Sequence, residues 1–439
     1  MGDTLRMETT RPGDAPELLR DGWPALVANL RVVDADGREV PTRSAGAAGW
    51  VLGPHGERIT AEYEVDYAPL ARQGWPAPRE AAYLDDSALL VVARSVFVGH
   101  DAPGAATVRF VAPAGWQVAA PWIREGDGFR ARSFAQLTTN AFALTRTQLS
   151  TTAAGGFVLQ SLPFGGWRAR DAEITGVLCA AAATFTGLFG GGERHGYLAA
   201  FLEAEEMAGE AYLDSYAMQA DPRTDRASWA RIVAHELFHY WNGQRLRGAD
   251  YTASQWFQEG VTEYYALLAS ARSGFMDEAE LLRQLSGRLG ASRGMTASLV
   301  ESGNRKNAAF YGRATITALL LDLTIRERSG GRRSLDDVLR AMWWQFGQTD
   351  RPYALAELYS TVTGIAGADA AAFLRSQVET AAPVEVHALL RTVGLESASY
   401  ATGAESITAD PTAGPAARTR WLSMISPRAD RSCPGSRRE

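Results

Sequence analysis

The chain has 439 residues, of which 46% are hydrophobic and 21% charged, and its net charge is −6. This length predicts two or three domains, and the composition is that of an ordinary globular protein rather than a fibrous or disordered one. The acidic balance, without a large basic block, argues against nucleic acid as a partner.

No run of eighteen apolar residues occurs, and the N-terminus lacks the apolar core of a signal peptide. We therefore expect no transmembrane helix, no membrane partner and a cytoplasmic location, although the true start of the chain cannot be set from its sequence. The two cysteines, Cys179 and Cys433, lie far apart, and the second falls in a polar tail. A structural disulfide is therefore not expected.

Residues 1–22 are polar and rich in Pro, Gly and charge, which is typical of a loosely ordered N-terminus. Residues 23–165 carry the signals of β-strands. Apolar and polar residues alternate from 58 to 67, as in a half-buried antiparallel strand. Apolar runs at 26–33 and 88–98 are bounded by turn residues. The pattern predicts an N-terminal antiparallel, β-sandwich-like domain.

The strongest chemical signal begins at residue 235. His235 and His239 are four apart in a helical pattern, so both imidazoles lie on one face and can bind one ion. Glu236 is rotated by roughly 100° from His235 and lies beside the ion. A second helical pattern carries Glu259 as a third ligand. Two imidazoles and one carboxylate leave one position of zinc open for water, so we predict one catalytic Zn²⁺ ion.

A second glutamate, Glu263, follows Glu259 by one helical turn and lies on the same face. A carboxylate at this position can accept the second N–H of a ligand histidine and fix its tautomer. Alternatively, Glu263 is a surface residue that pairs with Arg272 or with nothing.

Four stretches of the sequence resemble the glycyl aminopeptidase family, a branch of the gluzincin metallopeptidases related more distantly to aminopeptidase N. They are HELFHYWN at 235–242, WFQEGVTEYY at 256–265, LLDLTIR at 320–326 and SLDDVLR at 334–340. The similarity runs in order over roughly residues 20 to 395, and its motifs are specific only from about 225 to 345.

The resemblance implies a multi-domain β + α fold, in which the N-terminal β domain is followed by a thermolysin-like, mainly helical zinc peptidase domain. We place that domain at 166–396, after a Gly-rich boundary. Residues 397–439 are rich in Ala, Thr, Ser and Arg, which predicts a disordered tail. Members of the family often carry a PDZ domain at this end, and the present sequence does not contain one.

The resemblance also implies two further site residues. Glu210 stands 25 residues before His235, where aminopeptidase N has a glutamate that holds the free amine of the substrate. Glu205 and Glu206 are rivals for that role, and an ordinary solvated carboxylate is the alternative. Tyr311 stands 52 residues after Glu259, where related enzymes have a tyrosine that donates to the oxyanion; a core tyrosine is the alternative.

These residues predict zinc-dependent hydrolysis of a peptide bond, with Glu236 as general base. The resemblance implies an aminopeptidase that favours small N-terminal residues, Gly or Ala. A zinc endopeptidase, or a non-catalytic binding protein that retains the fold, are the alternatives. A peptide is the expected substrate, and the sequence does not determine the oligomeric state.

Overall fold

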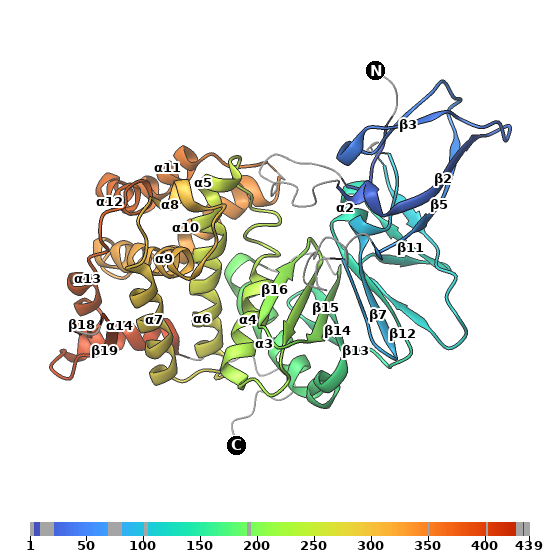
Figure 1. Cartoon of the computed structure of the whole chain (residues 1–439). Helices are drawn as coiled ribbons and strands as arrows, with labels where there is room; N and C mark the ends of the chain where they lie inside the picture. The colour runs from blue at the N-terminus through green and yellow to red at the C-terminus, as the bar shows by residue number, and fades with distance from the viewer. Residues whose placement is uncertain are drawn as a thin grey trace. The chain divides into compact units, whose positions relative to one another are not determined.

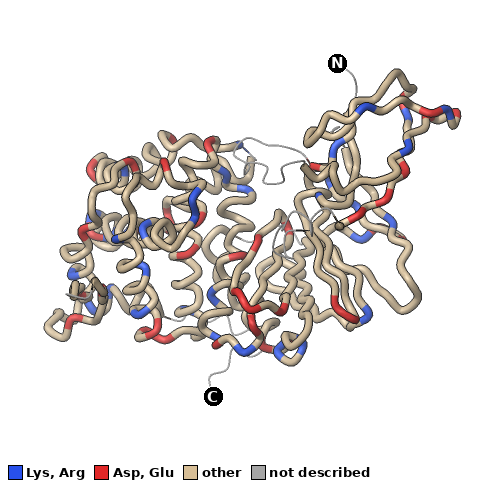
Figure 2. Tube along the Cα trace, in the orientation of Figure 1, with Lys and Arg blue, Asp and Glu red and all other residues tan. Residues whose placement is uncertain are grey.

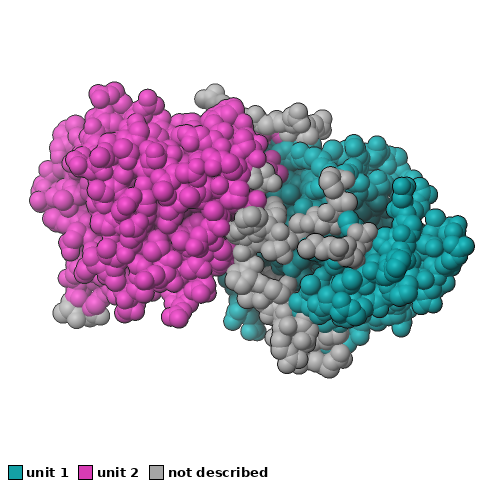
Figure 3. All heavy atoms as spheres, turned by 90° about the horizontal axis from the view of Figure 1, so that it is seen from above, with its two compact units in different colours: residues 1–152, 157–171, 194–222 teal, residues 153–156, 172–193, 223–439 magenta. Residues whose placement is uncertain are grey.

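A computed structural model describes residues 4–8, 22–68, 81–100, 104–190, 195–349, 351–400, 403–426 and 433. The chain divides into two compact units, drawn as ribbons in Figure 1 and as spheres in Figure 3. Unit 1 comprises 1–152, 157–171 and 194–222, and unit 2 comprises 153–156, 172–193 and 223–439. Antiparallel sheets come first along the chain and a largely helical region follows, which confirms the predicted fold class.

The described residues of unit 1 form four small antiparallel sheets with the strand orders β1-β4-β3, β2-β5, β10-β11-β8 and β6-β7-β12-β9. Their strands are β1 (Thr4–Leu5), β2 (Val27–Asp34), β3 (Thr42–Ser44), β4 (Trp50–Leu52), β5 (Ile59–Val65), β6 (Ala82–Leu84), β7 (Ala88–Val92), β8 (Ala106–Val108), β9 (Gln117–Ala119), β10 (Ile123–Glu125), β11 (Gly128–Ala131) and β12 (Ala141–Thr145). In β5, half-buried and exposed residues alternate as the sequence predicted.

Much of the predicted loosely ordered N-terminus, namely residues 1–3 and 9–21, lies outside the described residues. The part between them is ordered, which corrects that prediction. Thr4 and Leu5 pair with β4, and Leu5 is buried in an apolar cluster with Val32 and Leu52. Met7 is buried in a second apolar cluster, and Arg6 exchanges two backbone hydrogen bonds with Gly99, so buried side chains and backbone bonds together attach this segment.

The strand β7 is apolar on both faces, because it lies between two cores of unit 1. Leu90 and Val92 contribute to one buried cluster, whereas Val91 contributes to another that includes Trp122 and Phe142. A side-chain period of two sends successive residues to opposite faces, so an uninterrupted apolar strand is one that is covered on both sides.

The fifth sheet of unit 1 is mixed, with the order β13-β14-β15-β17-β16. Its strands are β13 (Ser150–Ala154), β14 (Phe157–Pro163), β15 (His195–Glu203), β16 (Ala208–Ala211) and β17 (Ser215–Ala220). The strands β14, β15 and β17 are parallel, and β16 pairs antiparallel with β17 at the edge. The continuous apolar run of β15 is buried at the centre, as parallel strands require.

Unit 2 is built from helices. They are α3 (Asp171–Phe189), α4 (Arg226–Phe238), α5 (Tyr251–Gln255), η6 (Trp256–Val261), α6 (Thr262–Arg272), α7 (Glu278–Ser292), α8 (Leu299–Ser302), α9 (Ala308–Arg328), α10 (Leu335–Met342), η7 (Trp343–Gly347), α11 (Leu355–Ala366), α12 (Ala368–Glu379), α13 (His387–Arg391) and α14 (Pro415–Ile425). The helix α4 packs against α6, and α9 packs against both η6 and α7. These contacts bring the predicted site residues of α4, η6 and α9 together.

The prediction of a disordered tail after residue 397 is wrong for residues 403–426. There the chain completes the hairpin of β18 (Leu395–Ser399) and β19 (Glu405–Ala409) and then forms α14. The side chains of Ile407 and Trp421 are buried. Arg418 and the indole N–H of Trp421 both donate to Glu278 at the start of α7. A few well-spaced apolar residues are enough to anchor a segment of polar composition.

The prediction of no structural disulfide is also wrong. Cys179 of α3 is bonded to Cys433, 254 residues further along the chain. Cys179 is buried, and the bond ties the tail to a helix of the same unit. Disulfides are rare in a reducing compartment, so this bond lends no support to the expected cytoplasmic location, which stays a prediction.

Two helical stretches, 165–189 and 308–328, are long and apolar enough to cross a membrane by length and composition alone. Most of each stretch is buried within the fold, 61% and 83% of the window respectively. Core helices pass the same test, so the apolar length of these two is weak evidence for a membrane span. Figure 2 shows acidic and basic residues interspersed along the described parts of both units.

Candidate metal and catalytic site

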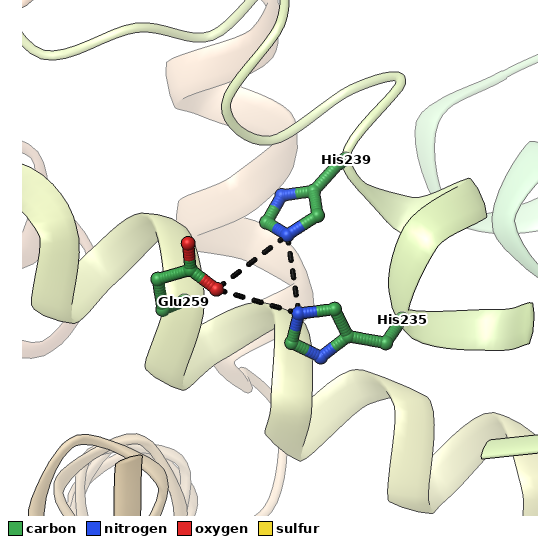
Figure 4. Close-up of side chains that lie close together, drawn as sticks. All are labelled: His235, His239 and Glu259. Atoms are coloured by element: carbon green, nitrogen blue, oxygen red, sulfur yellow. Dashed lines mark hydrogen bonds and ion pairs between the residues drawn. The ribbon is translucent and has the colours of Figure 1, made fainter. Parts of the chain in front are cut away.

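Three predicted metal ligands meet in unit 2 (Figure 4). The Nε2 atoms of His235 and His239 lie 3.1 Å apart. The Oε2 atom of Glu259 lies 3.4 Å from the first and 3.6 Å from the second. Zinc held tetrahedrally at about 2.0–2.1 Å would separate its ligand atoms by roughly 3.3 Å. The three donor atoms therefore fit one zinc ion, and all three residues are buried.

The far side of each imidazole is occupied by an acceptor. His235 Nδ1 lies 3.0 Å from Glu263 Oε2, and His239 Nδ1 lies 2.9 Å from the carbonyl oxygen of Asn242. Because both acceptors are oxygens, both Nδ1 atoms carry the proton and donate it. The lone pairs of the two Nε2 atoms consequently face the common point between the ligands, as a metal requires.

Glu263 is one of the most strongly held carboxylates of unit 2. Arg231 Nη1 donates to it at 2.7 Å and Arg288 Nη2 at 2.5 Å, in addition to the contact with His235. Its side chain is only 2% exposed. Burial alone would raise the pKa of Glu263, but the two guanidinium groups hold it well below its usual range. Glu263 is therefore an ionised partner of His235, and the alternative of a surface glutamate paired with Arg272 is wrong.

Asn242, in the segment after α4, helps to position the turn that carries Glu259. Asn242 Nδ2 donates to the carbonyl oxygens of Phe257 and Gln258, at 2.9 and 3.2 Å. Those residues belong to η6, a single π-helical turn between α5 and α6 that carries Glu259. Such turns occur mainly at functional sites, because the extra residue redirects side chains within a helix.

A glycine permits the close packing of η6 on α9. A Cβ at Gly260 would lie 2.4 to 2.7 Å from the Cβ, C and O atoms of Ala314. The carbonyl carbon and oxygen of Ala314 are backbone atoms, which cannot move aside unless α9 moves, so residue 260 has no room for a side chain. The lack of a side chain at Gly260, next to Glu259, thus allows η6 to pack closely on α9.

Glu236 and Tyr311 lie close to the ligands. Glu236 follows His235 on α4 and is buried. Tyr311 belongs to the first turn of α9, and its hydroxyl donates to Glu259 Oε2 at 3.1 Å. Burial raises the pKa of Tyr311 well above its usual value, and the charges of Glu259 and Glu236 add to the effect. Tyr311 is therefore a neutral hydrogen-bond donor beside the metal donors rather than a remote core tyrosine.

A cation contacts the other oxygen of the ligand carboxylate. Lys306 Nζ lies 2.8 Å from Glu259 Oε1, and its ammonium is 5.9 Å from the centre of the Tyr251 ring. Burial would lower the pKa of Lys306, but the charge of Glu259 raises it well above its usual range. Sequence reasoning missed Lys306, and it also missed Arg231 and Arg288. Lys306 contacts Glu259, and the two arginines contact Glu263, in each case across a long stretch of sequence.

Glu210 belongs to unit 1, whereas the metal donors belong to unit 2. It belongs to β16, the edge strand of the mixed sheet, where it pairs with Ala217 and is half-buried. The role of Glu210 as the amine anchor stays a prediction. Glu205 and Glu206 precede β16.

The fold and this site together define the class of protein: a zinc metallopeptidase with paired histidines on one helix and a glutamate on the next. Residues 228–313 match the model of the M61 glycyl aminopeptidase family, and this segment contains every metal donor and Tyr311. The chain is thus similar to the M61 glycyl aminopeptidase family over this segment, and it is an enzyme of the metallopeptidase class. No curated protein sequence matches the chain.

Solved structures have the same fold. An aminopeptidase N family protein from Idiomarina loihiensis superposes with a TM-score of 0.78 at 21% identity, covering 91% of this chain and 75% of its own. An M1 zinc metallopeptidase from Deinococcus radiodurans gives a TM-score of 0.53 at 19% identity, with 88% and 96% covered. A variant of the Deinococcus radiodurans enzyme bound to a Tyr-Ser-Ala substrate gives 0.52 at 18% identity, with 82% and 86% covered. At these identities the likeness concerns the fold alone.

Proposed function

We propose that this protein is a zinc-dependent aminopeptidase that removes small N-terminal residues, Gly or Ala, from peptides. The observation that carries the proposal is the convergence of three donor atoms at 3.1 to 3.6 Å with both imidazole Nδ1 atoms bonded to acceptors. The name of the matching family supports the glycyl preference. The Deinococcus relative binds a tripeptide, which supports a peptide substrate here, although its N-terminal tyrosine does not bear on the preference for Gly or Ala.

His235, His239 and Glu259 would hold the zinc ion, which supplies a Lewis acid that polarises the scissile carbonyl. Glu236, buried beside His235, accepts a proton from the attacking water and donates it to the leaving amine. Tyr311 would turn the hydroxyl hydrogen that it donates to Glu259 Oε2 toward the oxyanion that develops on the carbonyl oxygen, an interaction worth on the order of 2.7–4 kcal/mol for one donor.

Exopeptidase specificity requires a group that recognises the free amine. We propose Glu210 for this role, since it lies on the edge strand β16, and edge strands can pair with an extended peptide. An ionised carboxylate on such a strand would form an ion pair with the ammonium of the substrate. Glu210→Gln should raise KM for free peptides by about tenfold or more, while Glu205→Gln serves as the matched control.

The direct test measures metal and cleavage together. We expect about one zinc per chain by atomic emission, hydrolysis of glycyl and alanyl anilides, loss of both with a chelator and recovery with zinc. N-acetylated anilides should resist cleavage. Internal cleavage of N-acetylated peptides would instead identify an endopeptidase, and a purified chain that binds no zinc and cleaves neither class of substrate would refute the proposal.

A further inference from the structure

Lys306 is the only lysine in the chain. The sequence has 44 basic residues, and the other 43 are arginines. This single ammonium lies 2.8 Å from Oε1 of the metal-ligand carboxylate of Glu259. A chain that uses arginine at every other basic position thus has its one lysine at the metal site, and this contrast calls for a chemical reason.

The two oxygens of Glu259 have different neighbours. Oε2 lies near the Nε2 atoms of His235 and His239 and accepts from Tyr311, whereas Oε1 accepts from Lys306. A carboxylate can bind a metal through one oxygen or through both. An ammonium on Oε1 competes with the ion for that oxygen, so it favours binding through Oε2 alone.

The ammonium suits this task better than a guanidinium would. Lysine carries a compact point charge, which can contact one oxygen without reaching the second. Arginine presents a planar fork that binds both oxygens of a carboxylate side by side, and here it would compete for Oε2 as well. The Lys306 side chain is 34% exposed and Glu259 only 9%, so the cation reaches inward to a buried oxygen.

We propose that Lys306 is a positioning residue that makes Glu259 a one-oxygen ligand and thereby leaves room at the metal for water and the substrate carbonyl. The inference deepens the proposed function, because it depends on zinc being bound at this site. It assigns Lys306 no contact with the reacting atoms.

Zinc affinity, measured by competition with a chromogenic chelator, tests the proposal without reference to activity. Lys306→Met removes the competing cation and frees Oε1 for the metal, so zinc should bind more tightly by about tenfold or more. Lys306→Arg should weaken zinc binding, because the guanidinium competes for Oε2 as well. Arg305→Met removes the same charge from the adjacent exposed residue and should stay within about twofold of the parent.

Cobalt(II) in place of zinc gives the second readout, since its visible absorption weakens as the number of ligands rises. The Lys306→Met protein should absorb less strongly than the parent, because the second carboxylate oxygen joins the metal. An unchanged affinity or an unchanged cobalt spectrum in Lys306→Met would overturn the inference while the proposed function stands. A parent that binds neither metal would overturn both.

Discussion

Among the glutamates of unit 2 that are paired with arginines, Glu263 lies at the metal centre and Glu278 lies where the C-terminal tail attaches. Glu263 is 2% exposed and accepts from Arg231, Arg288 and His235. Glu278 keeps 27% of its side chain exposed and accepts from Arg418 and the Trp421 indole. The donor chemistry is alike, but the surroundings differ.

Burial decides what each group does. A buried charge costs several kcal/mol unless it is fully paired, so Glu263 and its arginines form an arrangement in which each member requires the others. A half-exposed pair is screened by water and contributes about 1 kcal/mol or less. The first arrangement orients a metal ligand, whereas the second attaches a segment. A substitution of Glu263 should therefore affect both the metal site and stability, whereas a substitution of Glu278 should affect stability alone, and by less.

The largest effect should come from Glu236→Gln, which retains the shape of the side chain but removes the base. We expect kcat to fall by about 10²–10⁴-fold, the range for loss of a general base. Zinc content and the unfolding midpoint should stay close to those of the parent. Glu278→Gln makes the same chemical change at the tail and should leave kcat unchanged. Full activity of Glu236→Gln would exclude Glu236 as the base.

Glu263→Gln should have the next largest effect. It leaves Arg231 and Arg288 without a negative partner in a buried place, which should lower the free energy of unfolding by about 3–5 kcal/mol. Zinc affinity should fall by about 10–100-fold, because the orientation of His235 is lost. Urea unfolding and chelator competition measure the two effects. Glu278→Gln is the matched control, at about 1 kcal/mol or less, and equal losses in both variants would contradict the role of burial.

The metal donors could be predicted because their arrangement is local. Residues four apart on a helix share a face, so the prediction of His235 and His239 as ligands needed only one helix. The prediction of Glu259 needed a second helix close in the sequence. Lys306, in contrast, stands 47 residues after Glu259 and is brought back by the packing of α9 on η6. Its signal was nevertheless present in the sequence as the single lysine among 44 basic residues.

The tail could not be predicted from the same sequence. Its composition resembles that of disordered segments, and the buried residues of α14, Trp421, Met424 and Ile425, cover little more than one helical turn, which is too short to give a periodic pattern. The partner of Cys433 lies 254 residues away, so no spacing rule connects the two cysteines. Order that depends on a few distant contacts is visible only in three dimensions.

Removing the disulfide should affect stability without affecting the chemistry. Cys433→Ser releases the tail from α3 and should lower the free energy of unfolding by about 2–4 kcal/mol. Activity at 25 °C should be unchanged. The measurement is urea unfolding with and without reductant: the parent should lose stability on reduction, and the Cys433→Ser protein should not respond. Two free thiols in the untreated parent, counted by alkylation and mass spectrometry, would contradict the bond.

The smallest expected effect is the loss of the stabilising contribution of Glu278 at low pH. Hydrogen bonds from Arg418 lower the pKa of Glu278 below its usual value of 4.5, against the opposing influence of partial burial. A carboxyl whose pKa is lower in the folded state stabilises the fold above its unfolded pKa and loses that contribution as the pH falls through its folded pKa. Because the pair is half-exposed, the contribution should be below about 1 kcal/mol.

The comparison that isolates this effect is the difference in unfolding free energy between the parent and Glu278→Gln, followed from pH 7 down to about pH 3 in the presence of chelator. Chelation keeps acid release of the metal out of the measurement, since both proteins are then without it. The difference should be positive at pH 7 and shrink toward zero as Glu278 takes up its proton. It should also shrink with added salt, because screening weakens exposed pairs. A difference that is independent of both pH and salt would mean that packing of the side chain, and not its charge, attaches α14 to α7.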